Sequence, residues 1–168
     1  MSKAVMLSIR PKWCEKIASG EKTIEVRKTR PKLETPFKCY IYCTLPKYPH
    51  EDFIATDYPR PQFYGGGKVI GEFTCERIAL ISYDGGELSS TTNAAFSPAT
   101  CLTRSEIIAY IGDKGRCYGW HMSNLRIYDT PRELSEFTGL RNTRFGAAPY
   151  DIKRAPQSWC YVEVMKDG

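Results

Sequence analysis

The sequence contains no apolar run that approaches the ~18 residues needed for a membrane-spanning helix. Its start, Met1 to Leu7, leads directly into a strand-like segment. It lacks the long apolar core and the small-residue cleavage site of a secretory signal. These two absences argue against a membrane protein and a secreted precursor, and we expect a cytoplasmic protein with no membrane partner.

Histidine is scarce, and the cysteines are wrongly spaced for a metal site or a disulfide framework. The chain has two histidines and seven cysteines, an odd number without any C-x-x-C pair. Cys39 and Cys43 are the closest cysteines, but so few histidines make a poor zinc site. We expect reduced, mostly buried thiols, no metal and no cofactor.

Internal repeats, heptads and a domain linker are also lacking. The 168 residues are 42% hydrophobic and 26% charged, which is typical of a globular chain with its own core. We therefore predict a single domain over residues 1–168. A Pro-, Tyr- and Gly-rich insert at about 45–67 interrupts it, in which Tyr58 and Tyr64 are candidates for a lid.

Positive charge is concentrated near the N-terminus. Residues 1–38 hold ten Lys and Arg against four Glu, giving +6, whereas the other 130 residues hold 14 basic and 15 acidic groups, giving −1. Such a local positive field suits a polyanion or a phosphate-bearing ligand. A solvated, lysine-rich surface is the alternative explanation.

The hydrophobic pattern predicts short strands and few helices. We expect strands over residues 4–9, 22–28, 37–44, 68–81 and 158–164, and a turn and strand within 118–128. We expect a loop over 84–100 and helices at 11–18, 103–110 and 130–137, the last two opened by capping-box patterns. This order favours a mixed α/β, mainly β fold, in which a small β-barrel is flanked by short helices.

The most informative segment is residues 20–27, GEKTIEVR. Gly20 permits a sharp turn from the helix into the strand, which Lys22 enters. The period of two places Ile24 and Val26 on one face, with Thr23, Glu25 and Arg27 on the other. The cation, carboxylate and guanidinium could bind a base and a phosphate or perform acid–base chemistry, or form only a surface ion-pair ladder.

This segment resembles the hallmark of the ASCH domain family, a PUA-like superfamily. The family pattern G-x-K-x-x-E-x-R is matched by Gly20, Lys22, Glu25 and Arg27. Residues 7–13 look like the family's opening strand and helix, and residues 118–121 and 156–162 look like segments of its phage- and prophage-type members.

The resemblance implies a PUA-like β-barrel with a cleft beside the motif strand, and an RNA or nucleotide ligand. Some small members are amidohydrolases of N4-acetylcytidine, in which the motif lysine is paired with a threonine nucleophile two residues before the arginine. This sequence has Glu25 at that place, and glutamate carries no hydroxyl. A Lys22/Glu25 acid–base pair acting on a modified nucleoside or on RNA is then the catalytic alternative.

The remaining candidates for the ligand site are aromatic or cationic. The tryptophans could stack on a base, and Arg10, between a strand end and a helix start, could meet a phosphate. These candidates are Arg10, Trp13, Thr23, Trp120, His121 and Trp159. Each tryptophan could equally belong to the core, and His121 could be structural.

The sequence thus leaves three hypotheses. The first is a nucleic-acid-binding module for RNA or a nucleotide, and the second is a hydrolase with Lys22 and Glu25 as catalytic residues. The third is a phage-borne factor that binds a protein through an apolar patch in the insert.

Overall fold

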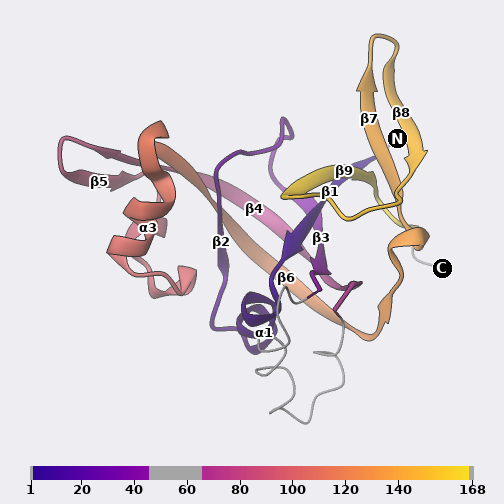
Figure 1. Cartoon of the computed structure of the whole chain (residues 1–168), viewed down its shortest axis with the longest axis horizontal. Coiled ribbons are helices and arrows are strands. Elements are labelled where there is room, and N and C mark those ends of the chain that lie inside the picture. Colours follow the sequence, from indigo (N-terminus) through magenta and orange to yellow (C-terminus); the bar gives the residue numbers. More distant parts are fainter. Residues whose placement is uncertain (1, 46–65, 167–168) are drawn as a thin grey trace. The chain divides into compact units, whose positions relative to one another are not determined.

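The computed structural model describes residues 2–45 and 66–166. The polypeptide divides into two compact units, which we describe separately: unit 1 is Met1–Glu15, Phe37–Thr74 and Asn124–Gly168, and unit 2 is Lys16–Pro36 and Cys75–Ser123. The elements in chain order are β1 (Lys3–Ile9), α1 (Pro11–Ser19), β2 (Ile24–Arg27), β3 (Phe37–Cys43), β4 (Lys68–Asp84), β5 (Glu87–Ser90), the 3-10 turns η3 (Ala94–Phe96) and η4 (Pro98–Thr100), α3 (Arg104–Ile111), η5 (Gly112–Lys114), β6 (Arg116–Arg132), η6 (Leu134–Glu136), β7 (Thr138–Thr143), β8 (Gly146–Asp151) and β9 (Trp159–Glu163) (Figure 1).

Unit 1 is a sheet with the strand order β6-β4-β3-β1-β9-β7-β8. Its centre is β1, which pairs in parallel with β3 and antiparallel with β9. Residues 4–9 of β1 are all buried, so this strand has the near-continuous apolar character of a strand covered on both faces. Buried side chains from several strands, including Met6, Tyr40 and Val162, form the core of the unit.

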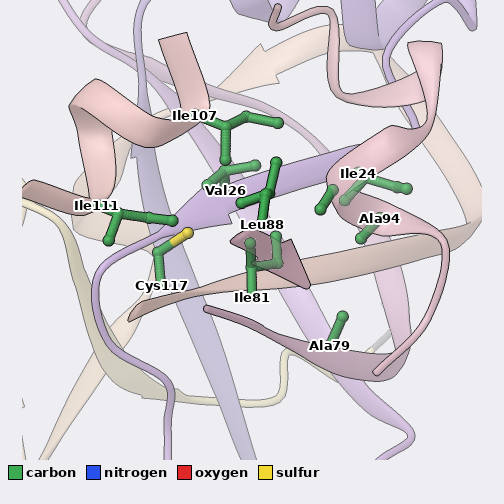
Figure 2. Close-up of a cluster of buried hydrophobic side chains, with 10 residues drawn as sticks. Ile24, Val26, Ala79, Ile81, Leu88, Ala94, Ile107, Ile111 and Cys117 are labelled. Carbon is green, nitrogen blue, oxygen red and sulfur yellow. The ribbon is translucent and has the colours of Figure 1, made fainter. Parts of the chain in front are cut away.

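Unit 2 contains the strand order β2-β6-β4, with β5 paired to β4. Its core joins side chains from β2, β4, β5, β6 and the helix α3 (Figure 2). Ile24 and Val26 of β2 point into this core, and Ile107 and Ile111 of α3 lie against them. The predicted alternation of β2 is therefore confirmed on its apolar side.

The strands β4 and β6 are long, at 17 residues each, and each has one part in unit 1 and the other part in unit 2. Gly71 in β4 is required by a close approach: a Cβ there would lie 2.5 Å from the backbone oxygen of Arg126 in β6. The turn and strand predicted within residues 118–128 are one continuous strand, in which Asn124 adopts a left-handed φ of 51°.

The structure corrects two further local predictions. The segment 84–100 contains β5 and two 3-10 turns rather than only a loop. The helix predicted from Thr130 is absent, because β6 continues through Arg132 and a capping box of Glu133 and Glu136 opens only the 3-10 turn η6. Pro131 fits either assignment, since its fixed φ is compatible with an extended strand as well as with a first helical turn.

Candidate functional site

The end of α1 places Lys22 at the entrance of β2. Gly20 has a φ of +87°, a left-handed conformation that glycine adopts without strain, and its N–H donates to Ile17 O at 3.1 Å. The backbone N–H of Lys22 then donates to Lys16 O at 3.0 Å. The sharp turn predicted at Gly20 is confirmed, and it directs the Lys22 side chain inward, where 1% of it is exposed.

The Lys22 ammonium has two partners, one distant in sequence (Thr100) and one near (Glu25). Its Nζ donates to the backbone oxygen of Thr100 at 2.5 Å and lies 3.7 Å from Glu25 Oε1. Thr100 closes η4 and is itself fully buried. The buried cation therefore contacts a carbonyl dipole and a carboxylate, the two kinds of partner that offset the loss of water around an ammonium.

Glu25 links the lysine to the arginine. Its Oε1 accepts a hydrogen bond from its neighbour's backbone, Val26 N–H, at 3.0 Å, and its Oε2 lies 3.3 Å from Arg27 Nη2. The exposed fractions of the side chains are 8% for Glu25 and 12% for Arg27. We call Lys22, Glu25 and Arg27 the motif network, and its shielding from water excludes the exposed ion-pair ladder that was its alternative explanation.

Burial lowers the pKa of Lys22 below its ordinary value of 10.5, because an ammonium loses hydration in the protein interior. Glu25 and Cys101 oppose this effect and favour the charged form, whereas the nearby Arg27 adds to it. Burial likewise raises the pKa of Tyr110, whose hydroxyl is close enough to be influenced by Arg27 and Glu25. Tyr110 of α3 is therefore an aromatic neighbour of the motif network.

The pairing of β2 with β6 places two predicted site residues, Trp120 and His121, on opposite faces of the sheet. Trp120 lies opposite Glu25 and His121 opposite Ile24, and directly opposite residues of an antiparallel pair share a face. Trp120 thus belongs to the face of the motif network, where it is completely buried. His121 belongs to the face of the core residue Ile24.

The surroundings of His121 fit a structural histidine. Its Nε2 lies 2.8 Å from Thr92 Oγ1, and Thr92 also accepts a hydrogen bond from Ala94 N–H at 3.1 Å. Burial lowers the pKa of His121, and Arg77 adds to this effect while Glu76 opposes it. The imidazole therefore favours its neutral form and joins β6 to the segment before η3.

Three predicted ligand residues lie in unit 1. Arg10 is exposed between β1 and α1, and Trp13 is half-buried with Lys12 Nζ 4.7 Å from the centre of its ring. Trp159 is half-buried and makes an edge contact with Tyr161 at 5.2 Å between ring centres. Their roles in a ligand site, like that of the exposed Thr23 in unit 2, stay predictions.

Sequence reasoning missed several neighbours of the motif network. Thr100 is 78 positions from Lys22 and contributes a backbone oxygen, so residue type gives no signal for it. Tyr118 pairs with Arg27 in the register of β2 and β6, and Tyr110 lies under Lys28, whose Nζ is 5.0 Å from the ring centre. Only the aromatic character of these two tyrosines could have indicated a ligand surface.

The cysteine prediction is confirmed for burial: Cys14, Cys39, Cys43, Cys75 and Cys117 are buried, and the seven cysteines are present as thiols rather than disulfides. In residues 2–45 and 66–166, no group of three or more His, Cys, Asp or Glu side chains could hold a metal ion. Over the same ranges, no helix is long and apolar enough to cross a membrane.

Several predictions stay predictions. Most of the insert, including Tyr58, Tyr64 and the expected apolar patch, lies outside the described residues. The single domain over residues 1–168, the phage-type origin and the cytoplasmic location are likewise untested.

Comparisons of sequence find no relative: no protein-family model matches the chain, and no curated protein matches it. The structure has clear neighbours. An ASCH protein from Zymomonas mobilis aligns with a TM-score of 0.59 and 18% identity, covering 95% of this chain and 87% of that one. A tyrosine-to-phenylalanine variant of that protein gives 0.54 and 16%, covering 95% and 90%, and a serine-to-alanine variant gives 0.59 and 18%, covering 95% and 88%.

These neighbours share the fold of this chain along nearly its whole length. The predicted fold class is confirmed: the chain is mainly β, residues 2–45 and 66–166 contain two short α-helices, and the structural neighbours are ASCH proteins of the same fold. Within the described part of the chain, the order of strands remains open in each unit and does not close into a complete barrel. The resemblance found at the motif is thus supported at the level of the fold.

Proposed function

We propose that the chain binds RNA or a nucleotide, and that the motif network supplies the charge that recognises its phosphate. The observation that carries this proposal is the charge balance of the network. With Lys22 protonated, two cations flank one carboxylate, so the motif network has a net charge of +1. A fixed positive charge with little water around it attracts an anion more strongly than the same charge on an open surface.

The segment around β2 strengthens this field. Residues 21–32 hold five basic groups and two acidic groups, giving +3. Lys28, Arg30 and Lys32 are exposed and follow the half-buried Arg27 along the chain. Exposed cations next to a buried one are suited to a ligand that combines several phosphates with one specifically held group.

Stability alone is a weak reason for such a network. Replacing a buried ion pair with apolar side chains of similar volume is often neutral or stabilising, because two ions must lose their water. Lys22 has 1% of its side chain exposed and Glu25 has 8%, so both ions have lost most of their hydration. Apolar side chains of the same volume would fill this space without that loss of free energy. Preorganised charge for a ligand gives the arrangement a function that apolar residues could not supply.

The test is a fluorescence titration of single-stranded RNA at low salt with the full chain and its Arg27→Ala variant. We expect Arg27→Ala to weaken binding about tenfold or more, which corresponds to ~1.4 kcal/mol. Arg104→Ala is the matched control, because Arg104 is an exposed arginine of the same unit and its loss changes the net charge equally.

Two results would remove the proposal. One is the absence of RNA and nucleotide binding by the full chain at low salt. The other is equal affinity of the Arg27→Ala and Arg104→Ala variants, since this would leave only a general effect of charge.

A hydrolase is the second candidate, because burial lowers the pKa of Lys22 beside Glu25. A lysine with a lowered pKa gives up its proton more readily, and a carboxylate 3.7 Å away is within reach of a small movement or a single water. The pair could accept and return a proton during hydrolysis of a modified nucleoside or of RNA. Glu25 would take the position of the threonine nucleophile, so water would have to be the attacking group.

Incubation of the full chain with N4-acetylcytidine and with labelled RNA distinguishes the two candidates. Turnover that disappears in Lys22→Met supports the hydrolase. Binding without turnover supports the binding module.

A further inference from the structure

We propose that the hairpin of β7 and β8 is a second nucleic-acid surface, which inserts into the minor groove of duplex DNA. This surface lies in unit 1, shares no residue with the motif network and goes beyond the function proposed above. The proposal rests on the hairpin's shape, its charge and the side chain at its tip.

The hairpin is a two-stranded ribbon for most of its length. Its register runs from Thr138↔Asp151 to Thr143↔Gly146, whereas among the described residues the register joins β7 to β9 at Gly139↔Val162 alone. Beyond that position no third strand from residues 2–45 or 66–166 lies beside the two strands (Figure 1). Residues 141–146 are all exposed. A free ribbon is of marginal stability in water, so a long exposed one requires a reason.

The charge of the ribbon is of one sign. Residues 138–150 contain Arg141 and Arg144 and no acidic residue, giving +2. Extending the count to residue 154 adds Asp151, Lys153 and Arg154 and gives +3. The complementary surface is a polyanion.

The tip presents an aromatic side chain to water. Phe145 has 88% of its surface exposed, and the guanidinium of Arg144 lies 5.0 Å from its ring centre. The turn is fixed by Thr143, whose Oγ1 donates to Gly146 O at 2.7 Å and accepts from Phe145 N–H at 3.1 Å. Proteins that bind the minor groove combine arginines with an apolar wedge that enters a base step, and this tip has both.

The second strand of the hairpin favours a nucleic acid over another protein strand. β8 is the last strand of its sheet, and such an edge could accept a partner strand through its backbone. Pro149 lacks an N–H and interrupts the donors of this edge. Gly146, Ala147 and Ala148 have small side chains, which let the backbone approach the wall of a groove closely.

The base of the ribbon is stiffened, so that the tip is presented in one direction. Tyr150 packs over Gly139, where a Cβ would collide with its ring. The guanidinium of Arg141 in turn lies 4.4 Å from the ring centre of Tyr150. Arg141 is thus stacked on Tyr150, on one face of the hairpin, and from there its guanidinium can reach a phosphate.

The experiment measures binding of the full chain to a short A·T-rich DNA duplex by fluorescence anisotropy across a salt series. The variants are Arg141→Ala/Arg144→Ala and Phe145→Ser. The matched control is Lys114→Ala/Arg116→Ala, which removes two exposed charges from unit 2.

We expect the arginine double variant to bind the duplex at least about tenfold more weakly, with a slope of log affinity against log salt smaller by about 2. Phe145→Ser retains the slope but loses the fluorescence increase of 2-aminopurine placed in the duplex, which reports an opened base step. Netropsin, a minor-groove ligand, competes with the wild-type chain. If the double variant aggregates, the single variant Arg144→Gln at the turn, with half the change in slope, replaces it.

The proposal is overturned if the hairpin variants bind the duplex as the control does. It is also overturned if Phe145→Ser loses binding to anionic lipid vesicles while duplex binding is unchanged. Single-stranded RNA separates the two sites: hairpin variants that retain RNA binding but lose duplex binding support this proposal, and a parallel loss of both contradicts a separate surface. Failure of the motif proposal appears instead as RNA binding that is indifferent to Arg27→Ala.

Discussion

At the scale of single residues, Lys22 organises the candidate site. Its ammonium contacts Thr100 O and Glu25, and each partner belongs to a buried part of unit 2. The sequence pattern predicted that Glu25 and Arg27 share a face, because the side chains of a strand alternate. It could not predict Thr100 as a partner, because a backbone oxygen 78 positions away has no sequence signature.

Lys22→Met should destabilise the protein by about 2–3 kcal/mol, because it leaves the carboxylate of Glu25 and the carbonyl of Thr100 without a buried cation. The methionine keeps most of the volume, so packing changes little. Urea denaturation measures this free energy of unfolding. A change below about 0.5 kcal/mol, as expected for a surface substitution, would show that Lys22 is solvated rather than buried.

The lowered pKa of Lys22 also predicts a pH dependence. Between its pKa in the folded state and 10.5, the unfolded chain binds the proton more tightly, so the free energy of unfolding rises with pH through this window. The difference in unfolding free energy between wild type and Lys22→Met isolates this contribution, since other groups titrate in both proteins. A difference that falls as the pH approaches 10.5 would contradict the burial of the ammonium.

At the scale of elements, α3 begins where the sequence predicted. Thr103 Oγ1 accepts from Glu106 N–H at 3.1 Å, and Glu106 Oε1 accepts from Thr103 N–H at 2.9 Å, which completes the capping box. The similar pattern at Thr130 did not open a helix, because β6 continues through Arg132. The hairpin β7–β8 was not predicted, since its Gly-, Ala- and Arg-rich strands lack apolar alternation.

Thr103→Ala should reduce the free energy of unfolding by about 1 kcal/mol through loss of the N-cap. Ser105→Ala, at an exposed position of the same helix, is the control and should change stability by less than about 0.5 kcal/mol. Thermal or urea unfolding of both variants measures the contrast. Equal effects would mean that the cap contributes nothing beyond helix propensity.

Gly71→Ala should destabilise β4 by about 1–3 kcal/mol, because the added methyl group would press on backbone that cannot rotate away. The nearest atom would be Arg126 O at 2.5 Å. Ser89→Ala, at an exposed position of β5, is the comparison with a small expected effect. Unchanged stability of Gly71→Ala would show that β4 and β6 can separate here without loss.

At the scale of the whole molecule, the mainly β class with short helices was predictable and the details of the sheet were not. The class followed from many short apolar segments and few helical ones, a property of the entire chain. The strand order depends on contacts between segments such as β1 and β9, which lie more than 150 positions apart. Local patterns contain no information on such pairings.

The motif network is the centre of this account, and a double-variant cycle on RNA affinity tests it most directly. Single-stranded RNA is titrated with wild type, Lys22→Met, Arg27→Ala and the double variant, under conditions in which circular dichroism shows each to be folded. If Lys22 and Arg27 act through Glu25 as one binding unit, each single variant weakens binding about tenfold and the double variant loses less than the product of the two. RNA affinity that is unchanged in both single variants, or losses that multiply independently, would contradict a shared site.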